Sequence, residues 1–213
     1  MNKIEHDVSE NAKVVPCWSC KGPVSTLALF CSTCGAVQPP GATDHFSRLG
    51  MAPRFVIAPA DLERQYFGFQ RRLHPDRFAT RSPKERALSQ QQATALNEAY
   101  ETLKDPLRRA AYLLRLAGRV VDVNGSATVD DPVLLMEAME MREALEEAST
   151  ADEIAALASR ADTEVAGCID AIARAFAGEE LDSVGSLVTR LKYLGKLAEE
   201  VKTRRIRMTR QDG

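Results

Sequence analysis

Four of the five cysteines lie in two pairs near the start of the chain, with two residues inside each pair. The first pair is Cys17 and Cys20, and the second is Cys31 and Cys34. A turn between two such cysteines brings both thiolates to one side of a metal, and two turns complete a tetrahedral set. The spacing predicts one structural Zn²⁺ per chain, because four thiolates leave no open coordination position. Iron in the same cage and a pair of redox dithiols are the alternatives.

The segment around these cysteines has to fold with the metal, because so small a module cannot bury a hydrophobic core of its own. We assign it to residues 17–38, after a disordered N-terminus at residues 1–16. Leu27, Leu29 and Phe30 are expected to form a short hairpin strand over the site. The fifth cysteine, Cys168, stands among apolar residues of a predicted helix and is expected to be a small buried side chain.

A second motif with binding chemistry is the tripeptide His74-Pro75-Asp76, which lies between two predicted helices. Pro75 disfavours helical geometry at His74, so the two helices can fold back on each other with the tripeptide exposed at the tip. The Asp76 carboxylate can pair with an arginine of a partner. The arginines near the turn can meet an acidic surface or form an ordinary solvated helix face: Arg64, Arg71, Arg72 and Arg77.

Helices have to position both motifs, because almost all of the sequence after residue 58 has helical periodicity. The expected helices span residues 59–73, 83–104, 106–117, 131–148, 150–177 and 180–206. Residues 118–130 are aperiodic and are expected to form a linker. Short loops join the last three helices and imply antiparallel packing in a bundle. The predicted fold class is mainly α, with a small zinc-binding β/loop module, a helical hairpin and a C-terminal three-helix bundle at residues 131–206.

Composition limits the class of protein. The chain has 213 residues, of which 45% are hydrophobic and 27% are charged, and this excludes a disordered, collagen-like or membrane-embedded chain. The net charge of −2 predicts no nucleic-acid or acidic-membrane partner. The first residues lack the apolar segment of a secretory signal and make a poor transit peptide, so we expect a compartment where thiols stay reduced. A Gly-rich phosphate loop and a nucleophile–base pair are both missing from the sequence, and we predict no enzyme.

The residues around the tripeptide resemble the J-domain family of co-chaperones, from Asp44 to about Leu116. Residues 70–73 precede the tripeptide, Arg77-Phe78 follows it, and residues 96–103 end the next helix. In that family the tripeptide and the basic face of the preceding helix bind a DnaK-type chaperone and stimulate its ATP hydrolysis. The resemblance implies a J-domain at residues 44–117, with these chaperone-binding residues: His74, Pro75, Asp76, Arg71, Arg72, Arg77 and Arg64.

Three further segments look like the HscB family within the J-domain proteins: residues 105–118, 135–143 and 190–194. These proteins join a J-domain to a C-terminal three-helix bundle, and they deliver an IscU-type iron–sulfur scaffold protein to a specialised HscA-type chaperone. A tetracysteine module in front is similar to that of eukaryotic and some bacterial members. The resemblance implies a co-chaperone that activates a partner's ATPase, in the bacterial cytoplasm or in the mitochondrial matrix.

The first bundle helix carries two apolar stripes, although a helix at the side of a bundle needs only one. At 100° per residue, one stripe contains Leu134, Ala138, Met141, Leu145 and Ala148 and can face the core. The second stripe is flanked by charge and is typical of a partner surface. In the HscB family this face and an aromatic residue of the last helix bind the scaffold. The implied residues are Leu135, Met136, Met139, Glu140, Arg142, Glu143 and Tyr193.

Several alternatives remain open at this point. Met136 and Met139 could instead pack under the J-domain or the zinc module. The whole chain could be a zinc-ribbon nucleic-acid-binding protein, a dithiol oxidoreductase, or a J-domain protein with a different client. The zinc module itself could orient the J-domain, dimerise the chain or contact the client.

Overall fold

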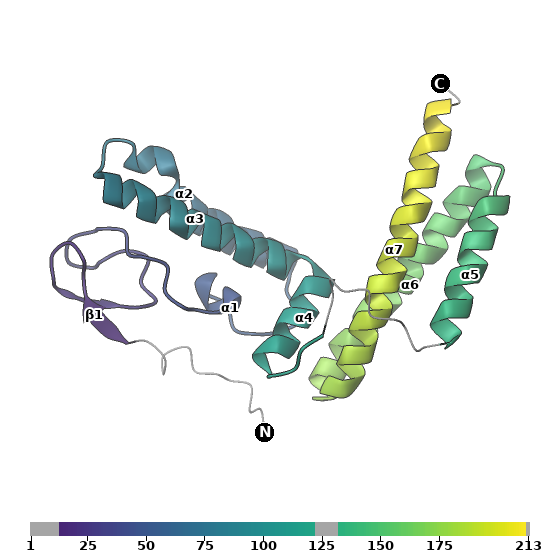
Figure 1. Cartoon of the computed structure of the whole chain (residues 1–213), viewed down its shortest axis with the longest axis horizontal. Helices are drawn as coiled ribbons and strands as arrows, with labels where there is room; N and C mark the ends of the chain where they lie inside the picture. The colour runs from purple at the N-terminus through teal and green to yellow at the C-terminus, as the bar shows by residue number, and fades with distance from the viewer. Residues whose placement is uncertain (1–12, 122–131, 212–213) are drawn as a thin grey trace. The chain divides into compact units, whose positions relative to one another are not determined.

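The structure is a computed structural model that describes residues 13–121 and 132–211 (Figure 1). Its contacts divide the chain into two compact units, Met1–Asp105 and Pro106–Gly213. The described residues form seven α-helices, one 3₁₀-helix and one two-stranded sheet, so the prediction of a mainly α fold with a small β/loop module is confirmed. Within these residues, none of the helices has both the length and the apolar character needed to cross a membrane.

The first unit begins with the cysteine module, which we define as residues 13–38. Its strands β1 (Val14–Pro16) and β2 (Pro23–Ser25) pair in antiparallel register around the first cysteine pair. An isolated bridge between Phe30 and Val37 brackets the second pair. Two predictions are therefore wrong in part. Leu27 and Leu29 lie outside the strands, and residues 14–16 form a strand where disorder was expected; residues 1–12 lie outside the described residues.

Four helices complete the first unit. The short helix α1 (His45–Arg48) begins after Asp44, whose carboxylate accepts hydrogen bonds from the backbone N–H groups of Phe46 and Ser47. Then come α2 (Pro59–Leu73), the 3₁₀-helix η1 (Pro75–Phe78) and α3 (Pro83–Lys104). The bounds of α2 and α3 are those predicted. Proline at the first helical position fixes where each helix begins. The two helices pack through fully buried leucines and a stacked pair of rings, Tyr66 and Tyr100.

The second unit contains α4 (Pro106–Leu116), α5 (Pro132–Glu147), α6 (Ala151–Ala177) and α7 (Leu181–Gln211). Helices α5, α6 and α7 form the predicted bundle, and α4 packs on α7. One cluster of the bundle core contains three residues of the predicted α5 stripe, Ala138, Met141 and Ala148, with Leu145 partly buried. Ile154 of α6 and Leu197 and Val201 of α7 complete this cluster, and Leu134 of the stripe is also buried. Residues 122–131 of the expected linker and helix start lie outside the described residues. The limits of the J-domain and bundle domains stay a prediction.

Candidate functional site

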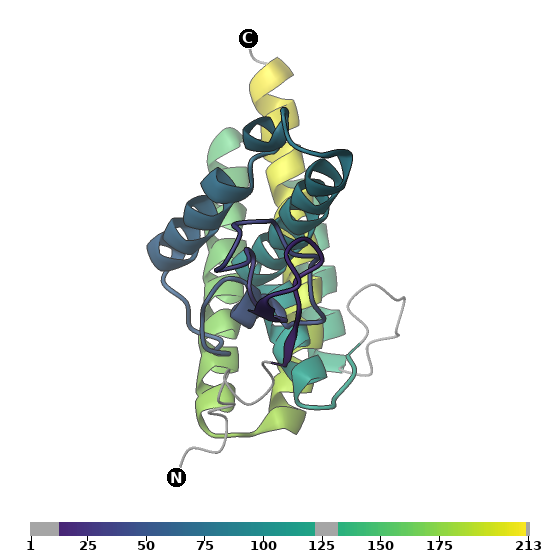
Figure 2. The same ribbon diagram turned by 90° about the vertical axis from the view of Figure 1, so that its left-hand side faces the viewer.

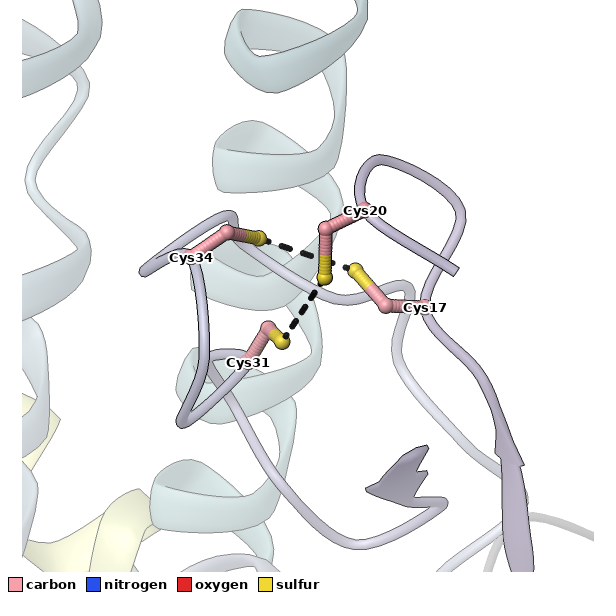
Figure 3. A group of neighbouring side chains, drawn as sticks. All are labelled: Cys17, Cys20, Cys31 and Cys34. Atoms are coloured by element: carbon pink, nitrogen blue, oxygen red, sulfur yellow. Dashed lines mark hydrogen bonds between the residues drawn. The ribbon is translucent and has the colours of Figure 1, made fainter. Parts of the chain in front are cut away.

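The four sulfurs of Cys17, Cys20, Cys31 and Cys34 converge on one point (Figure 3). All four lie within 4.8 Å of one another. The Sγ atoms of Cys17 and Cys34 are 3.8 Å apart, and those of Cys20 and Cys31 are 3.7 Å apart. Four thiolates at about 2.3 Å from a tetrahedral metal have to be about 3.8 Å from one another. The residues therefore fit a four-coordinate metal ion, and the predicted ligand set comes together.

Local hydrogen bonds prepare two of these thiols to lose their protons. Burial raises the pKa of the Cys17 thiol, but backbone N–H groups of Cys20 and Ser19, with the Gln38 amide, lower the pKa to about 6. The backbone N–H of Cys34 likewise lowers the pKa of Cys31 against the effect of burial. Although the Gly22 amide lowers the pKa of Cys20, the neighbouring thiols raise it to about 11. Cys17 and Cys31 therefore favour the thiolate form that a metal ligand must have.

The His-Pro-Asp tripeptide lies at the tip of the α2–α3 hairpin, as predicted. His74 has φ −54° and ψ 129°, the extended geometry that a following proline favours. The backbone N–H of Asp76 donates to His74 Nδ1 at 3.4 Å, and the Asp76 Oδ2 lies 3.5 Å from the same nitrogen. The His74 side chain is 55% exposed and the Asp76 side chain is 90% exposed. The Asp76 carboxylate is therefore open to a cationic partner group.

The four predicted arginines are exposed, but they have different surroundings. Arg64 pairs with Asp61, and the Arg71 Nε donates to the Phe67 carbonyl oxygen at 3.3 Å. The Arg72 guanidinium carbon lies 4.9 Å from the centre of the Phe30 ring, which belongs to the cysteine module. Arg77 is exposed in η1. Arg71, Arg72 and Arg77 are close to the tripeptide in the chain, whereas Arg64 lies between two and three turns of α2 before it.

Helix α5 has one buried face and one exposed face, as the two stripes predict. Leu134 and Met141 are each 1% exposed, whereas Met136 is 62% exposed and Met139 is 61% exposed. Leu135, Glu140 and Glu143 are also exposed. Within the second unit, Met136 and Met139 therefore lie outside the bundle core. We call the exposed set the α5 face: Leu135, Met136, Met139, Glu140 and Glu143.

Two other predicted scaffold-binding residues make contacts within the chain. Arg142 forms an ion pair with Glu200 of α7, at 3.0 Å between Nε and Oε2. Tyr193 is half-buried on α7, and the Lys196 ammonium lies 5.5 Å from its ring centre. One turn before Tyr193, Arg190 pairs with Glu137 of α5. This stretch of α7 is therefore held beside α5.

Some residues near these sites were missed by the sequence analysis. Gln38 is buried, and its amide donates to the Cys17 sulfur at 3.4 Å. Phe67 is 48% exposed on α2, and its spacing of three residues from Arg64 and four from Arg71 could have revealed a shared surface. The packing of Phe30 on Arg72 had no local signal, because the two residues are far apart in the sequence. Cys168 is buried as predicted, with its sulfur 3.5 Å from the Leu187 carbonyl oxygen.

The chain is similar in sequence to proteins of one family. Residues 130–202 match the family model described as "HSCB C-terminal oligomerisation domain". The Arabidopsis thaliana protein called iron-sulfur cluster co-chaperone protein HscB homolog is 34% identical over 186 residues, covering 87% of this chain and 72% of that protein. The Vibrio cholerae co-chaperone protein HscB homolog is 39% identical over 164 residues, covering 74% of this chain and 94% of that protein.

A solved structure gives the same result for the fold. The crystal structure of human co-chaperone protein HscB superposes with a TM-score of 0.81 at 31% sequence identity, covering 89% of this chain and 98% of that one. The plant and bacterial relatives are similar to this chain in sequence, and the human protein is similar in sequence and in fold. All three are named co-chaperones. The chain belongs to the HscB family of iron–sulfur cluster co-chaperones.

Proposed function

We propose that this chain binds an IscU-type iron–sulfur scaffold protein through its C-terminal bundle and delivers it to a DnaK/HscA-type chaperone. It stimulates the ATPase of that chaperone through the His-Pro-Asp turn. The chain has no catalytic role of its own in this scheme. Its domains in the proposal are a tetracysteine zinc module at residues 17–38, a J-domain at residues 44–117 and the bundle at residues 131–206.

The proposed binding of the scaffold protein is supported by one observation. Neighbouring residues of α5 differ sharply in how exposed their side chains are. Leu134 and Met141 already fill the bundle core, so the exposed Met136 and Met139 are not needed for folding. Exposed apolar residues flanked by charge are typical of protein-binding surfaces, and methionine adapts its shape to a folded partner. Arg142 and Tyr193 border this face in the proposal, and the pairing of Arg142 with Glu200 holds α5 in place.

The chaperone half is supported by the chemistry of the turn. Asp76 can accept two hydrogen bonds from an arginine of the chaperone. His74 and Pro75 fix the backbone from which Asp76 projects. Arg64, Arg71, Arg72 and Arg77 would meet acidic groups of the chaperone and speed its encounter with the turn.

The metal in this proposal is Zn²⁺, bound by Cys17, Cys20, Cys31 and Cys34. Four thiolates at tetrahedral separation suit zinc in a closed structural site. The ion would hold together a module whose own buried cluster is very small, with Cys17, Val24 and Cys31 as its members.

Two variants of the full chain separate the two halves of the proposal. Asp76→Asn should abolish stimulation of the chaperone ATPase and leave scaffold affinity, measured by calorimetry, at the wild-type value. Replacement of Leu135, Met136 and Met139 by alanine should weaken scaffold binding and leave the stimulation measured without scaffold unchanged. If each variant keeps both functions, the assignment of the two surfaces is wrong.

A further inference from the structure

The cysteine module lies beside α2 and α3 (Figure 2). It contacts them through two cation–π contacts and one hydrogen bond. The Arg72 guanidinium lies over the Phe30 ring, with 4.9 Å between its central carbon and the ring centre. The Lys84 ammonium lies 4.4 Å from the centre of the Trp18 ring. In the buried part of the interface, the Gln92 amide donates to the Gln38 carbonyl oxygen at 2.9 Å.

The two cation–aromatic contacts lie on opposite sides of the His-Pro-Asp turn. Arg72 stands two residues before His74, in the last turn of α2. Lys84 is the second residue of α3, just after the turn. Phe30 and Trp18 therefore hold the helix end before the turn and the helix start after it.

Both aromatic residues are next to a cysteine in the sequence, and both are held by contacts with Val37. Trp18 lies inside the first pair, and its indole N–H donates to the Val37 carbonyl oxygen at 2.7 Å. Phe30 immediately precedes Cys31, and its backbone pairs with that of Val37. Cys17 and Cys31, the direct neighbours of the two aromatic residues, belong to the buried cluster of the module. A metal bound to these cysteines would therefore restrain the backbone that carries both rings.

The segment that follows the module contacts both the module and α1. A Cβ atom placed on Gly41 would lie 2.5 Å from the Thr26 carbonyl oxygen, so the segment after the module packs closely against it. The Arg48 Nη2 donates to the Gly41 carbonyl oxygen at 3.0 Å and ties that segment to α1.

We propose that the metal-loaded cysteine module is a positioning device for the chaperone-binding end of the α2–α3 hairpin. Phe30 and Trp18 hold Arg72 and Lys84 on either side of the turn. Side chains that are already ordered lose less conformational entropy when they bind a partner. Loss of the metal frees both rings and weakens stimulation of the chaperone. The functional part of this inference rests on the proposed function above, whereas the docking of the module does not.

The docking is tested without any chaperone, because Trp18 is the only tryptophan of the chain. Its fluorescence in the full-length protein reports on the module alone. Removal of the metal with a chelator should shift the emission to longer wavelength, and added Zn²⁺ should restore it. Lys84→Met should change the emission of the metal-loaded protein and leave that of the metal-free protein unchanged. An emission that is the same with and without metal would overturn the inference.

The functional part is tested by Phe30→Leu, which removes the aromatic face but keeps an apolar side chain. It should raise the concentration needed for half-maximal ATPase stimulation about two- to fivefold, the range expected for one exposed cation–π contact. Metal content and scaffold affinity should stay at wild-type values. Phe30→Tyr should restore the wild-type concentration, because the ring is kept. Phe176→Leu, the same substitution in α6, is the matched control and should change nothing in this assay.

The outcomes distinguish this inference from the proposed function. If Phe30→Leu stimulates as wild type does while holding its metal, the positioning role is wrong. If wild type gives no stimulation, or Asp76→Asn stimulates as well as wild type, the proposed function fails, and the functional part of the inference fails with it. The fluorescence measurement then still decides whether the metal holds the module on the helices.

Discussion

Arg142 of α5 and Glu200 of α7 form a two-point ion pair across the bundle. The Nε–Oε2 distance is 3.0 Å and the Nη2–Oε1 distance is 3.1 Å. Hydrogen bonding to the Glu200 carboxylate raises the pKa of Arg142 above its ordinary value. Arg142 adjoins the α5 face, so the pair joins that face to the last helix.

The first prediction follows from this pair. Arg142→Ala and Glu200→Ala should lower scaffold affinity to a similar degree, because each releases the same restraint on α5. Each should destabilise the bundle by only about 0.2–1 kcal/mol, since the Arg142 and Glu200 side chains are 51% and 44% exposed. Calorimetry and thermal unfolding of the two single variants and the double variant would measure both effects. If Arg142→Ala alone lowers the affinity, Arg142 contacts the scaffold directly.

The second prediction uses two adjacent leucines of α5 as a matched pair. Leu134 is 1% exposed and Leu135 is 45% exposed. Leu134→Ala leaves a cavity in the core and should lower the free energy of unfolding by about 2–5 kcal/mol. Leu135→Ala should change that free energy by less than about 0.5 kcal/mol and should reduce scaffold binding. Chemical denaturation and a binding titration distinguish the two. Equal losses of stability would contradict the division of α5 into two faces.

These helix faces and ends were predictable because their signals are local. The stripe that includes Leu134 and Met141 follows from helical periodicity. Thr150 and Glu153 are three residues apart, and they form the predicted capping box at the start of α6. The four cysteine ligands were also predictable, because the two cysteines of each pair are only three residues apart in the sequence.

What could not be predicted depends on contacts between distant residues. Arg142 and Glu200 are on different helices, and no local pattern pairs them. Phe30 was expected in a strand over the cysteines, because its apolar neighbours suggested one. In the structure its backbone forms a single bridge with Val37 and its ring contacts Arg72. Leu27 and Leu29 line a small cavity beside Phe69 and Gln92. The strands formed at Val14–Pro16 and Pro23–Ser25, where the chain enters and leaves the first cysteine pair.

The third prediction concerns pH and the start of α6. Backbone N–H groups of Ser149 and Thr150 lower the pKa of Glu153, since they bind its ionised form. The stabilisation is therefore complete above the ordinary glutamate pKa of about 4.3 and is lost as the pH falls through the lowered value. Glu153→Gln should reduce the melting temperature at pH 7 and differ less from wild type at pH 3.5. A difference that does not vary with pH would argue against this effect.

The fourth prediction concerns the metal. Purified wild type should contain one Zn²⁺ per chain by elemental analysis, and Cys31→Ser should lose most of it because three thiolates remain. Ser32→Ala changes the next residue, which is exposed and is no ligand, and should keep the full content. Iron in the wild-type protein, or full metal content in the cysteine variant, would contradict the proposed site.

The central claim is that one chain joins a scaffold-binding surface to a chaperone-stimulating turn. The most direct measurement is the steady-state ATPase of a DnaK/HscA-type chaperone with this protein, an IscU-type scaffold, or both. The account predicts that both together stimulate more than the sum of the two alone. Alanine at Leu135, Met136 and Met139 should remove that excess and leave stimulation by the chain alone. Stimulation that is simply additive in wild type, or an excess that survives the alanine substitutions, would contradict the account.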